Sequence, residues 1–593
     1  MGRYIPHIIF FLSFAAVGLR IWVAEDAYIT FRAIENLYAG HGLVYNPGER
    51  VEVFSHPIWM MILVLIRGMG LPLHSASIVT GMVLILFSIG ILIYGKNRDG
   101  KNIFPLSVLL LISISGFRDF ATGGMEFSLL FLFLTVLYST LHRYNLKDAP
   151  SFYATIFSLL YLTRPEMALI YVWYASFFLY ELFISANSNI KNFLIKSLKP
   201  ITQWAIPTLL WIGGYHLFRY MYYGDLFPNT YYAKSGLSSY YPQGIKYFIY
   251  SLIWAPGFII LLSFPFAVLF AVKKGILKIS SSQIKFFRDA AAPYLIVFYT
   301  IRLGGDFMAF RFFLPVMAML ALVLHNFISE NVDELKQFME EKIWNRFSFL
   351  KFSSEARQGL AILFFFLLSF WPVPLHKGFV GDERRIFMKD MTKTSLKDMF
   401  LSESHPWGNS GKKFHILQDC LSYDDFWITN SQAHASCLKG VGLGYFGVNA
   451  GSNVKVLDEQ ALPSPEIALQ PVLMRFRPGH EHYITMTDVI TKGAIFCSSG
   501  EPAYDRIMMT NAGIIIKFDP ELLAGIPDIK NRLTKLLNLK KSGSNIIPRL
   551  EKRYNTTLEE LISKSAGWEK DPVMNKKNQC WNNFPEDTSK FFY

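Results

Sequence analysis

The chain has 593 residues, of which 52% are hydrophobic, 16% aromatic and only 17% charged, whereas charged residues make up roughly 25% of soluble domains. This composition excludes an ordinary soluble globular protein and indicates a large membrane-embedded part, and the length predicts a second structural unit. The formal net charge of +13 comes largely from short basic blocks between apolar segments rather than from one basic stripe, so we exclude a nucleic-acid-binding protein.

The apolar segments predict an α-helical multi-pass membrane protein with about eleven crossings and a cytoplasmic N-terminus. The first segment also fits a cleaved signal peptide, but the many later segments favour an uncleaved helix. Residues 57–69 are too short to cross and predict a helix on the outer surface, which makes every later basic block cytoplasmic. The crossings are expected at residues 5–23, 75–95, 103–118, 124–142, 151–164, 166–185, 201–222, 245–272, 290–302, 308–328 and 359–378.

An odd number of crossings places the rest of the chain outside the cytoplasm. We therefore divide the chain into a transmembrane module, 1–378, whose outer loop 24–74 carries juxtamembrane helices, and a periplasmic domain, 379–593. Strand patterns at 427–429, 454–457 and 513–518 and helical patterns at 520–537 and 548–563 predict a mixed α/β domain.

The cysteines agree with an outer location for this domain. All four lie in it, as expected in an oxidising compartment. Three pairings are open, and proximity along the chain favours Cys420 with Cys437 and Cys497 with Cys580.

Ionisable residues gather at the predicted outer ends of the spans. Such groups are costly at membrane depth and normally pair or line a polar cavity. A cavity that mixes cations with carboxylates suits the transformation of an anionic lipid headgroup. The set comprises Glu25, Asp26, Arg32, Arg118, Glu126, Arg164, Glu166, Asp225, Lys234, Arg302, Asp306 and Arg311.

Residues 25–38 predict a helix on the outer surface, because apolar residues recur in them at helical spacing. Asp26 at its start can cap the helix, or it can act as a general base that takes the proton of an attacking sugar hydroxyl. The cations Arg164, Lys234 and Arg311 can snorkel to lipid headgroups or bind the phosphate of a lipid-linked donor, as can Arg302.

Several segments resemble, in chain order, motifs of the GT-C superfamily of polyprenyl-phosphate-sugar-dependent glycosyltransferases, in particular the branch of the mycobacterial terminal arabinofuranosyltransferase. Residues 25–32 and GHGLVYNPGERVE at 40–52 are similar to its acidic first outer loop. TGGME at 122–126, TRPE at 163–166, YGDLFPNTYYAK at 223–234 and GGDFMAFRFFLP at 304–315 are similar to its later membrane motifs. GYF at 444–446, VLD at 456–458 and RPGHE at 477–481 resemble pieces of its outer domain.

The resemblance implies a GT-C-like fold and inverting transfer of one sugar, such as arabinofuranose, from a polyprenyl phosphate on the outer face of the inner membrane. The acceptor would be a cell-envelope glycan or an exported protein. The branch usually has a second Asp where this chain has Glu25, so Asp26 is the expected base and Glu25 a supporting carboxylate. The expected substrate-binding residues are Arg32, His41, His56, Glu126, Asn229, Asp306 and His480.

Two other functions share parts of this pattern. A transporter or flippase of lipid-linked sugars should show internal repeats and charges at the midplane, whereas the charges here gather at one face. A ligase or polymerase that uses a polyprenyl-diphosphate glycan shares the outer-face chemistry. No compact cluster such as Asp-x-Asp predicts a metal site, so we assign no cofactor and leave a divalent ion at the leaving phosphate open.

Overall fold

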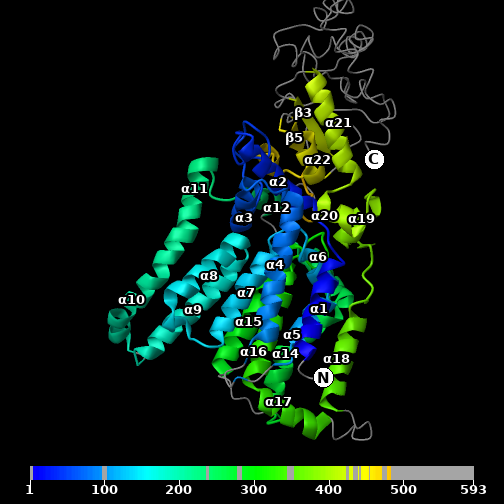
Figure 1. Cartoon of the computed structure of the whole chain (residues 1–593). Helices are drawn as coiled ribbons and strands as arrows, with labels where there is room; N and C mark the ends of the chain where they lie inside the picture. The colour runs from blue at the N-terminus through cyan, green and yellow to red at the C-terminus, as the bar shows by residue number, and fades with distance from the viewer. Residues whose placement is uncertain are drawn as a thin grey trace, which may run out of the picture.

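A computed structural model describes residues 4–96, 100, 103–187, 189–235, 239–276, 283–343, 353–421, 426–431, 438–439, 442–452, 454–469 and 477–482. These residues form a helical bundle with a smaller C-terminal domain, residues 376–482, at one end (Figure 1). The N-terminus and α17 (Val332–Phe338) lie at the opposite end of the bundle (Figure 1).

The first part of the bundle consists of apolar helices joined by short turns. Its helices are α1 (Ile5–Gly18), α2 (Glu25–Tyr38), α3 (Pro57–Gly68), α4 (Leu73–Tyr94), α5 (Leu106–Ser113), α6 (Ser115–Phe120), α7 (Phe127–Leu141), α8 (Pro150–Thr163) and α9 (Met167–Ser185). A hydrogen bond of 2.9 Å between His7 and Tyr94 joins the start of α1 to the end of α4. These two helices therefore run in opposite directions.

The second part of the bundle contains the most buried helix of the core. Its helices are α10 (Ile190–Thr208), α11 (Gly214–Tyr223), α12 (Asn229–Ser235), α13 (Tyr241–Trp254), α14 (Pro256–Lys273), α15 (Gln283–Leu303), α16 (Leu314–Glu330), α17 and α18 (Ser354–Leu368). α16 packs against α5, α7, α14 and α15 and is buried along most of its length. Its apolar side chains point in all directions, as expected for a helix with no solvent-facing side.

Among the described residues, three helices are long and apolar enough to cross a membrane, namely α4, α9 and α14. A fourth is reached if α16 and the following segment, bent by 85°, count as one span. The protein is thus a largely helical one with apolar spans, and the larger number of crossings stays a prediction.

Two expected crossings differ from the helices in the structure. The segment 103–118 is divided between α5 and α6 at Ile114, and the segment 245–272 is divided between α13 and α14 at Ala255. Ala255 has φ −135° and ψ 81°, because Pro256 disfavours helical backbone in the residue that precedes it. The hydrophobic run continues through this break, so apolarity alone did not reveal it.

The C-terminal domain contains both helices and strands in its described part. Its helices are α19 (Glu383–Asp390), α20 (Leu396–Leu401), α21 (Pro406–Leu421), α22 (Leu443–Ala450) and α23 (Pro465–Ala468), and its strands are β1 (His376–Lys377), β2 (Val380–Gly381), β3 (Phe426–Ser431), β4 (Leu438–Lys439) and β5 (Val454–Asp458). β4, β3 and β5 form a parallel sheet in that order. The strands predicted at 427–429 and 454–457 are confirmed.

Other predictions for this domain fall on parts of the chain that the structure does not describe. They are the strand at 513–518, the helices at 520–537 and 548–563, and the cysteine pairing, since Cys437, Cys497 and Cys580 lie outside the described residues.

The C-terminal domain docks on the first outer loop through α2. α2 packs against α22, and Tyr28 of α2 contacts Tyr445 edge to face with ring centroids 4.8 Å apart. Asn46 of the loop both donates to the carbonyl of Val456 and accepts from its backbone N–H, each at 3.0 Å. The amide of Asn46 thereby bonds β5 much as a neighbouring strand would.

Candidate active site

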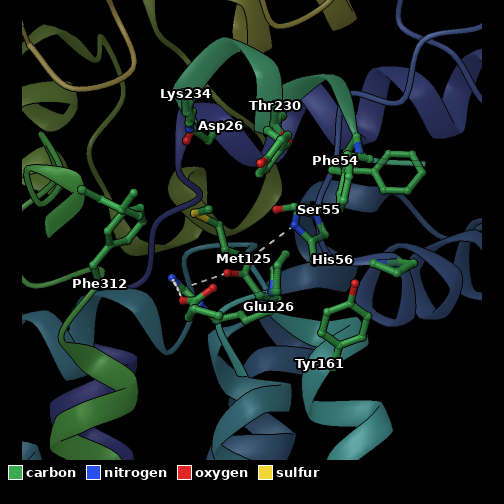
Figure 2. Close-up of a pocket in the computed structure, with 18 of the residues that line it drawn as sticks. Asp26, Phe54, Ser55, His56, Met125, Glu126, Tyr161, Thr230, Lys234 and Phe312 are labelled. Carbon is green, nitrogen blue, oxygen red and sulfur yellow. Dashed lines mark hydrogen bonds and ion pairs between the residues drawn. The ribbon is translucent and has the colours of Figure 1, made fainter. Parts of the chain in front are cut away.

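A cavity of about 570 Å³ lies where the bundle meets the C-terminal domain. Its walls come from α2, the loop before α3, the ends of α8 and α15, and the segment containing α12 (Figure 2). Leu462 of the C-terminal domain also lines it. The predicted site residues that line the cavity are Asp26, His56, Glu126, Arg164, Lys234, Arg302 and Arg311.

Asp26 faces the cavity and does not cap its helix. The N-cap of α2 is Ala24, and no side chain caps this end. Instead, Oδ2 of Asp26 accepts a hydrogen bond of 2.9 Å from Nη1 of Arg311. Burial alone would raise the pKa of the Asp26 carboxyl, but the charges of Arg311 and Lys234 offset this and hold the pKa below its ordinary value.

The loop between α15 and α16 has an unusual backbone that presents Arg311. Gly305 has φ 75°, and an added Cβ there would lie 2.4 Å from the ring of Tyr247. Phe310 has φ 69°, a conformation that is rare and strained for a bulky residue. Nη1 of Arg311 also lies 3.7 Å from Oδ2 of the buried Asp306, so two carboxylates fix this guanidinium.

Lys234 lies beside Asp26 in Figure 2. Among the described residues, no carboxylate lies within ion-pair distance of its ammonium group. Burial, and next the charge of Arg311, lowers the pKa of Lys234, while Asp26 opposes the shift. Lys234 is therefore a partly buried cation on the cavity wall.

Arg164 occupies the cavity wall at the end of α8. The following Pro165 requires extended backbone, and Arg164 has φ −148° and ψ 121°. Its guanidinium lies 3.1 Å from Oε1 of Glu126 and 2.5 Å from Oε1 of Glu166. These two carboxylates take up most of its donor groups, so Arg164 is less available to a phosphate than Lys234.

His56 links Glu126 to α2. Its Nδ1 lies 3.5 Å from Oε2 of Glu126 (Figure 2). Its Nε2 lies 3.1 Å from Oγ1 of Thr30. Burial lowers the pKa of His56, although Glu126 partly offsets the shift. The imidazole is therefore neutral at pH 7.

Other predicted residues hold the protein together outside the cavity. Oε1 of Glu25 accepts a hydrogen bond from the N–H of Gly444, and burial, then the charge of Asp26, raises the pKa of Glu25 to about 8. Arg32 donates to the carbonyls of Tyr45, Gly447 and Val454. Both side chains join α2 to its surroundings and neither lines the cavity.

The remaining predicted residues also lie outside the lining of the cavity. Asn229 donates to the carbonyls of Ala461 and Leu462 at 2.8 Å, and His41 is exposed in the loop after α2. His480 packs edge to face on Phe307 with ring centroids 4.8 Å apart, and burial lowers its pKa to about 3.

Thr30 and Arg219 are among the lining residues that the sequence did not predict. Thr30 stands one helical turn after Asp26, and this spacing is a signal that could have identified it. Arg219 of α11 forms a buried ion pair with Glu52 at 2.5 Å. The two partners are 167 residues apart, so no local pattern reveals the pair.

Within the described part of the chain, no group of three or more His, Cys, Asp and Glu side chains is arranged to hold a metal ion.

Comparison with known proteins gives two related sequences, both named terminal β-(1→2)-arabinofuranosyltransferase. The protein of Mycobacterium tuberculosis is 28% identical over 351 residues, which are 51% of this chain and 52% of the relative. The protein of Corynebacterium glutamicum is 24% identical over 546 residues, which are 81% of this chain and 76% of the relative. No protein-family model and no solved structure matches the chain.

These relatives confirm the relationship to arabinofuranosyltransferases that the ordered motifs indicated. In the first relative, the chain matches only about half of that protein's length.

Proposed function

We propose that this protein is an inverting glycosyltransferase of cell-envelope biosynthesis that moves a single sugar from a polyprenyl phosphate to a hydroxyl of a glycan or an exported protein. The observation that supports this most is the joint presence of Asp26, Arg311 and Lys234 in one cavity. A carboxylate and a cationic pair around one small space are what such a displacement requires. The names of the relatives suggest arabinofuranose as the sugar.

In the proposed reaction the acceptor oxygen attacks the anomeric carbon and the bond from that carbon to the phosphate oxygen breaks. The phosphate leaves on the polyprenyl chain with the electron pair of the broken bond. The acceptor hydroxyl gives its proton to Asp26. Lys234 and Arg311 stabilise the charge that grows on the leaving phosphate.

Arg311 connects donor binding to the state of the base. Its Nη1 bonds Asp26, and an ion-paired carboxylate is a weak base. A donor phosphate beside Lys234 competes for the same guanidinium. Asp26 loses part of this pairing and becomes a stronger proton acceptor when the donor is in place.

The reaction would occur on the outer face of the inner membrane, with the C-terminal domain in the periplasm over the cavity. Leu462 gives this domain a direct place in the cavity wall. The C-terminal domain would therefore hold the acceptor close to Asp26. The cytoplasmic side, with the basic loops, would face away from the reaction.

Purified full-length protein supplied with radiolabelled polyprenyl-phosphate arabinofuranose and an arabinofuranosyl oligosaccharide tests the proposal. We expect labelled product from this monophosphate donor and none from a polyprenyl-diphosphate glycan. Asp26→Asn is the inactive control. Turnover of the diphosphate donor alone would contradict the proposal, and NMR of the product's anomeric configuration tests inversion.

A further inference from the structure

Hydrogen-bond acceptors line one wall of the cavity beside Arg164, whose guanidinium is already paired with Glu126 and Glu166. Glu126 is only 5% exposed, and its Oε2 forms no hydrogen bond of ordinary length with a described residue, since Nδ1 of His56 lies 3.5 Å away. A buried acceptor that lacks a well-formed hydrogen bond is unfavourable, by up to about 1–3 kcal/mol. A bound ligand that donates a hydrogen bond would relieve this cost, and a phosphate dianion, which only accepts, would not.

Thr30 is a second acceptor on this wall, because its own proton is used. Glu126 can only accept, so it favours the imidazole tautomer that carries the proton on Nδ1 of His56, 3.5 Å away. Nε2 of His56 is then unprotonated and accepts the hydroxyl proton of Thr30 at 3.1 Å. The lone pairs of the Thr30 oxygen are left for a donor in the cavity.

The position of Thr30 relative to the base fits a sugar. Asp26 and Thr30 are four residues apart on α2 and both line the cavity. This spacing is one turn, roughly 6 Å along the helix axis. A sugar whose reacting atoms lie at Asp26 can therefore bring another hydroxyl to Thr30.

We propose that Thr30, His56 and Glu126 form a hydroxyl-binding subsite that selects the sugar by one of its non-reacting hydroxyls. The proposal rests on the proposed glycosyl transfer and deepens it. The hydroxyl belongs either to the sugar being transferred or to the terminal sugar of the acceptor. His56 sets the direction of the hydrogen bonds, and Thr30 and Glu126 receive the ligand.

The test combines Thr30→Val, which replaces the hydroxyl by a methyl group of similar size, with sugars that each lack one hydroxyl. kcat/KM is measured for full-length protein with polyprenyl-phosphate arabinofuranose and its monodeoxy analogues. The same is done with an arabinofuranosyl oligosaccharide acceptor and its monodeoxy analogues. The two series separate a donor hydroxyl from an acceptor hydroxyl.

With the wild type, kcat/KM for one of the monodeoxy sugars should be roughly 3- to 10-fold lower than for the parent sugar, which corresponds to the loss of one neutral hydrogen bond. With Thr30→Val, the same deoxy sugar and the parent sugar should have equal kcat/KM. Thr135→Val is the matched control, since Thr135 is buried in α7 and, among the described residues, its hydroxyl bonds the carbonyl of Phe131. It should keep the wild-type loss. If every deoxygenation lowers kcat/KM by the same factor in Thr30→Val as in the wild type, the subsite is refuted.

His56→Ala gives an independent reading should Thr30→Val fail to fold. It frees the Thr30 hydroxyl to donate as well as accept, so the discrimination between the sugar and its deoxy analogue should shrink. Unchanged discrimination would contradict the proposal. If the wild-type protein turns over no monophosphate donor, the proposed function is refuted instead. The subsite is then tested by the dissociation constants of the parent and deoxy sugars, compared between the wild type and Thr30→Val.

Discussion

Replacing Asp26 by Asn removes the proposed proton acceptor while keeping the shape of the side chain. The amide oxygen can still accept a hydrogen bond from Nη1 of Arg311, which lies 2.9 Å from the carboxylate in the wild type. Asp306, 3.7 Å from the same nitrogen, continues to balance the charge of Arg311. The folded state should therefore lose no more than about 1–3 kcal/mol.

The effect on transfer should be much larger. General base catalysis contributes about 10²- to 10⁴-fold, so we expect Asp26→Asn to lower the rate of labelled sugar transfer by that factor at saturating donor. Single-turnover assays with radiolabelled donor measure the rate, and binding of the same donor should persist, because Lys234 and Arg311 remain. Glu25→Gln is the matched comparison, since it changes the neighbouring carboxyl, which does not line the cavity. A wild-type rate in Asp26→Asn would show that Asp26 is not the base.

Lys234→Ala should raise the apparent KM for the donor about 10-fold or more, as expected for loss of a hydrogen bond to a charged group, and an unchanged KM would refute its role at the phosphate. Because the folded-state pKa of Glu25 is raised to about 8, the wild type should lose stability as pH rises from about 5 to 8, since the unfolded state releases this proton first. Glu25→Gln should flatten this dependence, so the Tm of the variant minus the Tm of the wild type should be more positive at pH 8 than at pH 5. Arg32→Ala should lower the Tm strongly, because it leaves three buried carbonyl groups with fewer donors, and a wild-type Tm would contradict the docking role.

The sequence was informative where a pattern is local. Hydrophobic runs predicted most of the helices, and the two strands around 427–429 and 454–457 were confirmed. The ordered motifs brought Asp26, Lys234 and Arg311 into one hypothesis, and the fold brings them to one cavity. Their positions in the chain, far apart, show why only the fold could tell that they share this space.

The sequence did not predict which of the charged residues on α2 face the cavity, because this depends on the direction of each side chain. Glu25 and Asp26 are neighbours, so composition and charge treat them alike, but adjacent positions on a helix are rotated by about 100°. Asp26 therefore faces the cavity, whereas Glu25 faces Gly444. Arg32 was predicted as a substrate-binding residue for the same reason: its charge is visible in the sequence, but its buried carbonyl partners are not.

α2 thus has two functional faces, and their relation explains how the C-terminal domain can influence chemistry that occurs in the bundle. Glu25, Tyr28 and Arg32, at helical spacing, contact the C-terminal domain or the loop bound to it. Asp26 and Thr30 stand on the face toward the cavity. The loop that carries Arg311 also bonds the C-terminal domain, because Gly381 accepts from the N–H of Ala309 and donates to the carbonyl of Phe307, each at 2.9 Å. The position of the proposed base is consequently fixed from outside the bundle, which is a physical reason for the two units to be joined in one chain.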